Sequence, residues 1–210
     1  MKYTTVSSLK QTNKPLTIGI DQSLTGFAMT ALVIDDPNDF ACWVYKSPHF
    51  GVERLLDIQE WMIARFDELG KKNIKNVAME GTVLASQAAL VLGELSALVR
   101  ITLHGYYKGV EEAQYPLKVP PMTLKKFAAG KGNAKKQEML LQIYKRWGIE
   151  FNNDNAADSY ALARLASGNS INQVEKDIIN QMKTLVALYK IMPKDEDFFE
   201  DVLSIEVRNG

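Results

Sequence analysis

Short runs of apolar and β-branched residues dominate the first fifty positions of the chain and predict three strands. The runs occupy residues 17–21, 27–34 and 41–47. Gly26 and the turn-forming residues 35–39 separate them. Because these connections are too short to hold a crossover helix, we expect the three strands to be antiparallel. Residues 1–14 are polar and predict a flexible lead-in.

After position 50 the pattern changes to helical periods interrupted by two further strands. Apolar residues recur every three to four positions along each predicted helix, and a short apolar run bounded by turn residues marks each strand. The predicted helices cover residues 52–69, 86–106, 122–129, 134–147, 154–167 and 171–191. The predicted strands cover residues 75–80 and 114–119. A helix precedes the first of these strands, which is therefore expected to run parallel to the strand at 17–21.

The order β-β-β-α-β-α-β-α predicts an α/β fold with a mixed five-stranded sheet and helices on both faces. At 210 residues the chain is long enough for one such domain and an appendage. We place the domain at residues 15–170. A C-terminal helical extension with an acidic tail is predicted at residues 171–210.

The balance of 25 basic and 25 acidic residues hides an uneven distribution of charge. Residues 118–146 hold eight Lys and Arg residues against Glu138 alone, which is a net charge of +7. Residues 195–206 hold six acids and no basic residue, a net charge of −6. The basic block is either a solvated helical face or a phosphate-binding surface, and the second interpretation makes nucleic acid a candidate partner.

Cysteine use and hydropathy predict a soluble, cytoplasmic protein. Cys42 is the only cysteine, which excludes an intramolecular disulfide and fits a reducing compartment. No apolar run is long enough to span a bilayer, and the first residues lack the apolar core of a signal peptide. We therefore expect no membrane partner.

Three carboxylates stand where an α/β fold would bring them together. Asp21 and Glu80 each end a predicted strand, and Asp158 lies on a late predicted helix. An acid on an apolar strand is costly to bury unless it is paired. Three such groups together would form a site for a hard divalent cation such as Mg²⁺. His49 and His104 have no partner at metal-ligand spacing, and we interpret them as surface or packing residues.

Four segments resemble the motifs of the RuvC-type Holliday-junction resolvases, in the same order and with compatible spacing. The segments are residues 19–26 (GIDQSLTG), 79–81 (MEG), 123–136 (TLKKFAAGKGNAKK) and 155–163 (NAADSYALA). The last segment is similar to the form common among phage-encoded relatives. The resemblance covers residues 17–167 and implies a ribonuclease H-like fold, whereas the segment after Ile171 resembles no motif of the family.

The resemblance implies that Asp21, Glu80 and Asp158 are catalytic acids and metal ligands. The bacterial family usually has a further acid three residues before the last one, where this chain has Asn155. Asn155 can still ligate through its amide oxygen, and the neighbouring Asp154 can supply the missing charge, so both alternatives stay open. Two Mg²⁺ ions about 3.5–4 Å apart, replaceable by Mn²⁺, would activate water and stabilise the leaving 3′-oxygen.

The resemblance also assigns roles to lysines in the basic block. Lys125 and Lys136 match the family's two active-site lysines. Lys136 is implied to offset charge in the transition state, and Lys125 to hold a neighbouring phosphate. A second departure from the family is Val83, where bacterial members carry an aromatic side chain used against DNA bases. With the other lysines of the basic block, the expected DNA-binding residues are Lys125, Lys126, Lys131 and Lys135.

The implied function is cleavage of four-way (Holliday) junctions or other branched DNA by a homodimeric, metal-dependent endonuclease of recombination and repair. A phage-encoded member would act in the host cytoplasm. Two alternatives stay open: a nuclease selective for forks or flaps, and a non-catalytic DNA-binding or scaffolding member of the fold. The expected dimer surface is the helix at 86–106, whose small and apolar residues either meet a second subunit or pack on the sheet. These residues are Ala88, Ala89, Leu92, Leu95, Ser96 and Val99.

Overall fold

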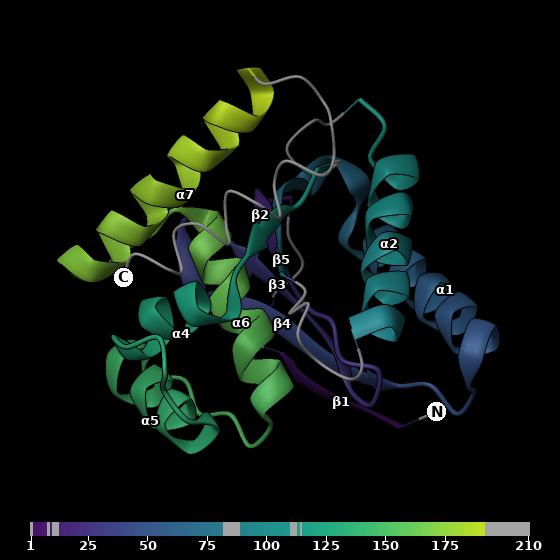
Figure 1. Ribbon diagram of the computed structural model, residues 1–210, viewed down its shortest axis with the longest axis horizontal. Helices are drawn as coiled ribbons and strands as arrows, with labels where there is room; N and C mark the ends of the chain where they lie inside the picture. Colours follow the sequence, from purple (N-terminus) through teal and green to yellow (C-terminus); the bar gives the residue numbers. More distant parts are fainter. Residues whose placement is uncertain are drawn as a thin grey trace.

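The computed structural model describes residues 2–7, 9, 13–81, 89–109, 113 and 115–191. Its centre is a mixed sheet with the strand order β1-β4-β3-β2-β5-β6 (Figure 1). The strands are β1 (Lys2–Ser7), β2 (Leu16–Asp21), β3 (Phe27–Val33), β4 (Asp36–Lys46), β5 (Ile74–Glu80) and β6 (Leu117–Val119). The pairs β1–β4, β4–β3 and β3–β2 are antiparallel, whereas β5 runs parallel to both β2 and β6.

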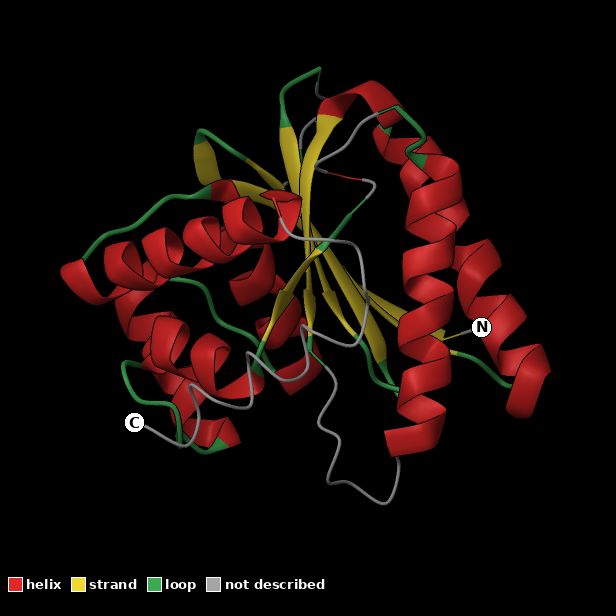
Figure 2. Cartoon of the chain, turned by 45° about the horizontal axis from the view of Figure 1, so that its top comes forward, coloured by secondary structure: helices red, strands yellow, loops and turns green. Residues whose placement is uncertain are grey.

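Helices cover both faces of this sheet, as Figures 1 and 2 show. α1 and α2 pack together on one face, whereas α6 lies across the other face with α4, α5 and α7 around it. The helices are α1 (Gly51–Leu69), α2 (Ala89–Tyr106), α4 (Pro121–Ala129), α5 (Lys136–Trp147), α6 (Asp154–Ser167) and α7 (Gln173–Ile191), with a short 3-10 helix η1 (Lys71–Asn73). Of the helices in the described ranges, none is long and apolar enough to cross a membrane.

The predicted fold class is confirmed. The five predicted strands are present, the first three are antiparallel, and β5 runs parallel to β2. The predicted helices are also present, and α7 is the helix of the C-terminal extension, whose predicted acidic tail lies outside the described residues. The domain boundaries at residues 15 and 170 remain predictions.

The flexible lead-in predicted for residues 1–14 is wrong for Lys2–Ser7, which form a sixth strand, β1. This strand pairs with β4 from Lys2 opposite Lys46 to Ser7 opposite Ala41. Strand pairing uses backbone groups, so a polar segment can add to an open sheet edge without a run of apolar residues. The sheet is therefore one strand wider than the hydrophobic pattern predicts.

The turn predicted at residues 35–39 is also shorter than expected. The chain turns at residues 34–35, and β4 already begins at Asp36. Because Leu32 pairs with Phe40 and Val33 pairs with Asp36, residues 37–39 bulge out of the ladder. Pro37 lies in this bulge, where its missing N–H breaks no rung of the sheet.

β2 divides its residues between the two faces of the sheet. Ile18 and Ile20 are buried in the core beneath α1 and α2. Thr17, Gly19 and Asp21 alternate onto the face that α6 covers, because successive side chains of a strand point to opposite sides. The only acid of β2 therefore points toward α6.

α6 lies directly on the backbone of β2. A Cβ atom on Gly19 would overlap with the backbone of α6 at Ser159 and Ala163, so the position requires glycine. One turn further along the helix, Thr17 Oγ1 donates a hydrogen bond to the carbonyl oxygen of Ala163 at 2.9 Å. α6 thus runs antiparallel to β2, and its first turns lie beside the end of β2 that holds Asp21.

Half of the residues predicted for a dimer surface belong to the core of the subunit instead. The apolar stripe of α2 packs against the sheet, so residues on this side of the helix are buried. These buried residues are Leu95, Ser96 and Val99. Ala89 and Leu92 are half-buried, and Ala88 lies outside the described residues. The exposed side of α2 carries Leu90 and Ile101.

Candidate active site

The ends of two neighbouring parallel strands bring two carboxyl groups together. β2 and β5 pair with Ile20 opposite Met79, so Asp21 and Glu80 are the next residues along the two strands. Alternate residues of a strand share a face and adjacent strands lie about 4.8 Å apart. The two acids therefore lie side by side on the face that α6 covers.

The first turns of α6 add a third carboxyl group. Asn153 caps the helix by accepting a hydrogen bond from a backbone N–H in its first turn, so the helix begins at Asp154. A contact of 2.8 Å between the hydroxyl oxygens of Thr30 and Ser159 fixes the rotation of α6 on the sheet. Asp154 and Asp158 lie one turn apart on the same side of the helix, toward Asp21.

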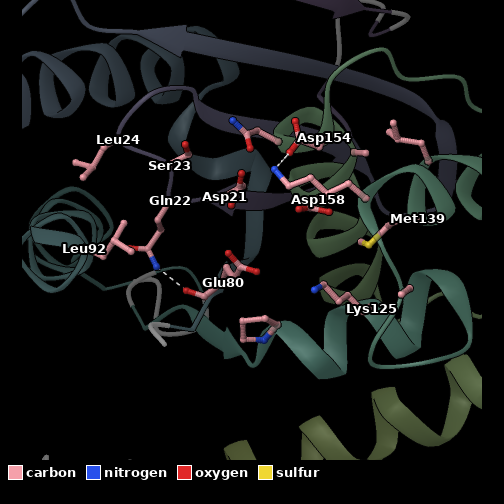
Figure 3. A pocket seen from close by; sticks show the side chains of 16 residues that line it. Asp21, Gln22, Ser23, Leu24, Glu80, Leu92, Lys125, Met139, Asp154 and Asp158 are labelled. Atoms are coloured by element: carbon pink, nitrogen blue, oxygen red, sulfur yellow. Dashed lines mark hydrogen bonds and ion pairs between the residues drawn. The ribbon is translucent and has the colours of Figure 1, made fainter. Parts of the chain in front are cut away.

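A pocket of about 360 Å³ lies where these three segments meet. Asp21, Glu80 and Asp158 line it from β2, β5 and α6, and Figure 3 shows their side chains around the same space. Lys125 of α4 and Lys136 of α5 line the pocket as well. The structure therefore brings together all five residues that the sequence singles out as the catalytic acids and active-site lysines.

The other predicted DNA-binding lysines lie outside this pocket. Lys126, Lys131 and Lys135 are exposed. The Nζ of Lys131 pairs with Glu138 Oε1 at 2.7 Å. Val83, the second departure from the family pattern, lies outside the described residues.

Burial raises the pKa values of all three acids, and repulsion from neighbouring acids adds to this effect at Asp21 and Asp158. Burial raises the pKa of Asp21 well above its usual range, and the charges of Glu80 and Asp158 add to this effect. Burial, followed by the charges of Glu80 and Asp154, raises the pKa of Asp158 to about 7. Burial also raises the pKa of Glu80, against the opposing effects of a hydrogen bond with Asp21 and two nearby lysines. The cluster carries negative charge that its surroundings do not fully balance, which favours binding of protons or cations.

An ion pair joins Lys136 to Asp154 at the pocket. Lys136 is the first residue of α5 and Asp154 the first residue of α6, and the Nζ of the lysine binds Oδ2 of the acid. This contact raises the pKa of Lys136 above its usual value and lowers the pKa of Asp154. Two ionised side chains from separate helices therefore meet beside the three carboxyl groups of the pocket.

Asn155 has a different partner from its neighbour. Its Nδ2 donates a hydrogen bond to the carbonyl oxygen of Gly26 at 2.8 Å, and a Cβ atom on Gly26 would lie 2.6 Å from this nitrogen. A carboxylate has no N–H to donate, so an acid could not make this bond. The contact is a physical reason for an amide at position 155, and it leaves Oδ1 as the acceptor of that side chain.

Gln22 is a pocket residue that the sequence pattern does not reveal. Its Nε2 donates to the backbone carbonyl oxygen of Glu80, which ties the end of β2 to the end of β5 beyond their last backbone pair. Its Oε1 is buried and has no hydrogen-bond partner among the described residues. The only signal in the sequence is its place directly after Asp21, because its partner lies 58 positions away.

Oxygen atoms that could bind a divalent cation line the pocket, although their present positions do not form a complete coordination site. Within the described part of the chain, no three His, Cys, Asp or Glu side chains are arranged to hold a metal ion as they stand. The chemistry of the donors still fits, because carboxylate and amide oxygens are the ligands that Mg²⁺ prefers. Burial, and at Asp21 and Asp158 also repulsion, makes the ionised acids costly, and a bound cation would stabilise their charged form. Side-chain rotation would have to draw the carboxylates together around an ion.

Comparison with solved structures identifies the architecture. RuvC from Thermus thermophilus matches with a TM-score of 0.57 and 21% sequence identity, over 80% of this chain and 97% of that chain. The chain has a RuvC-type fold. A second match, Thermus thermophilus RuvC in complex with Holliday junction substrate, has a TM-score of 0.57 and 19% identity over 81% of this chain and 97% of that chain. No family model and no curated protein matches the sequence.

The RuvC-type fold accounts for most of the chain. The bacterial protein is covered over nearly its whole length, whereas about a fifth of this chain has no counterpart in it. The resemblance that the four sequence segments indicate is thus confirmed at the level of the fold.

Proposed function

We propose that this protein is a metal-dependent endonuclease that hydrolyses phosphodiester bonds in four-way (Holliday) junctions or other branched DNA. One observation carries the proposal: Asp21, Glu80 and Asp158, from three distant segments, line one pocket together with Lys125 and Lys136. The RuvC-type fold supports it. So does the sequence, because its motifs single out these five residues without reference to the fold.

The acids would hold the metal ions. Asp21 is the central ligand in this proposal, because β2 lies between β5 on one side and the first turns of α6 above it. Glu80 and Asp158 complete the ligands from either side, and Asn155 adds its Oδ1. Two Mg²⁺ ions, or Mn²⁺ in their place, would supply an activated water and stabilise the leaving oxygen. Because the pKa values of the acids are raised, binding of cations would displace protons from them.

The lysines would bind the DNA backbone. Lys136 contacts the scissile phosphate in this proposal, and its ammonium group offsets the negative charge that builds up in the transition state. Lys125 holds the neighbouring phosphate. Lys126, Lys131 and Lys135 extend the basic surface on the outside of the protein, so binding would weaken steeply as the salt concentration rises.

A symmetric substrate calls for two active sites. Resolution of a four-way junction takes two cuts on opposing strands, and a two-fold dimer supplies two sites in that relation. We therefore propose a homodimer that meets through the exposed side of α2. Leu90 and Ile101, which are 79% and 66% exposed, lie about three turns apart on that side. One of the structural neighbours, Thermus thermophilus RuvC, is in complex with Holliday junction substrate.

Cleavage of synthetic DNA tests the proposal. A labelled four-way junction, a fork and a linear duplex of the same sequence are incubated with the protein in Mg²⁺ and in EDTA. We expect paired cuts in the junction in Mg²⁺ and none in EDTA, with the duplex left intact. Preference for the fork would instead indicate a fork or flap nuclease of the same fold. Binding of the junction without cleavage in Mg²⁺ or Mn²⁺ would contradict the proposal and indicate a non-catalytic DNA-binding protein.

A further inference from the structure

Asp154 and Asn155 are neighbours at the start of α6, yet their side chains have different partners. Asn155 is bonded to Gly26 beside β3, whereas Asp154 is bonded to Lys136 of α5. Both residues line the pocket. Asp154 is thus already engaged by a cation of the protein itself. To coordinate a metal ion in place of the acid that position 155 lacks, it would have to give up that partner.

The ion pair determines where the ammonium group of Lys136 lies. The Lys136 side chain is 81% exposed, whereas that of Asp154 is 32% exposed. A lysine side chain surrounded by solvent samples many rotamers, and a partner must fix it if its charge is to stay in one place. Asp154 can do this because the first turn of α6 holds it one turn before Asp158. Figure 3 shows this contact at Asp154, close to Asp158.

We propose that Asp154 is a positioning residue, which holds the ammonium group of Lys136 over the carboxylate pocket for contact with the scissile phosphate. It is not the ligand that replaces the missing acid. This inference rests on the proposed function, in which Lys136 offsets charge in the transition state. Asp154 acts through Lys136 alone. Its charge is matched by that lysine, so the cations are left with the three carboxylates of Asp21, Glu80 and Asp158 and the amide oxygen of Asn155.

A double-mutant cycle separates the two roles of Asp154. Cleavage of the four-way junction is measured for the wild type, Asp154→Ala, Lys136→Ala and the double variant. We expect Lys136→Ala to lower kcat about 100-fold and Asp154→Ala about 10-fold, with KM for the junction nearly unchanged. In the Lys136→Ala background, Asp154→Ala should add less than about a twofold loss, because residues that act through one another are not additive. If Asp154→Ala lowers kcat by the same factor in the wild type and in Lys136→Ala, Asp154 acts independently of the lysine, as a metal ligand would.

Binding of Mn²⁺ to the DNA-free protein gives a second readout that needs no activity. Titration calorimetry should show Asp154→Ala within about threefold of the wild-type affinity, whereas Asp158→Ala should weaken binding at least about tenfold. Glu68→Ala is the matched control, since it removes an acid paired with Arg65 on α1, away from the pocket. It should change neither kcat nor Mn²⁺ affinity. If Asp154→Ala lowers Tm, Asp154→Leu takes its place in the cycle, because it also removes the oxygen acceptor for Lys136.

These measurements test the positioning role of Asp154 separately from the proposed nuclease function. A tenfold loss of Mn²⁺ affinity in Asp154→Ala, or additive losses in the cycle, overturns the positioning role and leaves the nuclease proposal intact. Coupled losses with unchanged Mn²⁺ affinity support the positioning role. Failure of the wild-type protein to cleave any branched DNA is a different result, because it overturns the proposed function and the inference with it.

Discussion

Gly19 of β2 and Ser159 of α6 are in backbone contact: a Cβ atom on Gly19 would lie 2.0 Å from the carbonyl oxygen of Ser159. Gly19 stands two residues before Asp21, and Ser159 directly follows Asp158. The helix therefore approaches the sheet closely next to the acids on both segments. The missing side chain at position 19 sets how near the carboxyl groups of β2 and α6 can come.

Gly19→Ala should consequently disturb both the fold and the site. The added methyl group can fit only if α6 moves away from the sheet, which we expect to lower the free energy of unfolding by about 3 kcal/mol. Cleavage of the junction should fall as Asp158 moves away from Asp21. Urea denaturation measures the first effect and a junction assay the second.

Gly93→Ala on α2 is the control for this substitution. A Cβ atom there meets nothing within 4 Å, so the variant should be as stable as the wild type or about 1 kcal/mol more stable through helix propensity. A Gly19→Ala variant with wild-type stability would contradict the packing described here.

Neutralising the strand acids should remove cleavage without removing DNA binding. Asp21→Asn and Glu80→Gln keep the shape of each side chain and delete a charged ligand, so we expect cleavage to fall about 1,000-fold or more. Junction affinity, measured by gel shift at fixed salt, should stay near the wild-type value because the basic surface is intact. Glu53→Gln, on the exposed side of α1, is the control. A variant that still cuts at a near wild-type rate in Mg²⁺ would show that the metal site is misplaced.

The strand acids could be predicted from the sequence because local patterns and one rule of sheets suffice. Asp21 and Glu80 each end an apolar strand, and parallel neighbours end at the same edge of a sheet. The motif around Asp158 predicts this acid as well. Its approach to Asp21, however, depends on the contact of Gly19 with the backbone of α6, and a backbone contact produces no periodic pattern of apolar residues in the sequence. Gln22 was missed for a similar reason, since its partner is a backbone carbonyl of a distant strand.

The basic block shows a different limit of sequence interpretation. A run of lysines predicts a charged surface but does not indicate which members face a pocket. Lys125 and Lys136 line the site, whereas Lys126, Lys131 and Lys135 do not. The direction of each side chain follows from how α4 and α5 pack against α6, which is a tertiary contact. For a similar reason the hydrophobic pattern does not predict β1, because its pairing with β4 uses backbone groups and requires no run of apolar residues.

The raised pKa values predict that the metal-free protein loses stability as pH rises. Asp158 has a pKa of about 7 in the folded protein, against about 3.9 in an unfolded chain. Between these values the folded state binds more protons than the unfolded state, so the free energy of unfolding falls with increasing pH. The pKa values of Asp21 and Glu80 shift in the same direction. The lowered pKa of Asp154 acts oppositely, and its contribution is lost only in more acidic solution.

Thermal melts test this dependence on pH and metal. In EDTA, Tm should be higher at pH 5 than at pH 8, and Mg²⁺ should raise Tm more at pH 8, where it does not compete with protons. Asp158→Asn should reduce the difference between the two pH values. A Tm in EDTA that rises from pH 5 to pH 8 would contradict the shifts described for the three acids.

Restoring an acid at position 155 should destabilise the metal-free protein. Asn155→Asp replaces the N–H that binds the Gly26 carbonyl with an oxygen and adds a negative charge beside Asp154 and Asp158. We expect the free energy of unfolding in EDTA to fall by about 1–3 kcal/mol, with recovery in Mg²⁺. Asn155→Ala loses the hydrogen bond without adding charge, so it should lose about 1 kcal/mol and gain little from Mg²⁺. Wild-type stability of Asn155→Asp in EDTA would mean that the bond to Gly26 contributes nothing.

The exposed side of α2 should hold two subunits together. A glutamate in the centre of an apolar interface would be buried without a partner, so Leu90→Glu and Ile101→Glu should each shift a dimer toward monomer in sedimentation at micromolar concentration. Paired cuts in the junction should then give way to single nicks. Val52→Glu is the control, because Val52 is 70% exposed on α1 rather than α2 and should leave the dimer unchanged. A wild-type protein that is monomeric both alone and on junction DNA would contradict the resolvase proposal, since one site cannot make two symmetric cuts at once. A general nuclease for branched DNA would then account for the site instead.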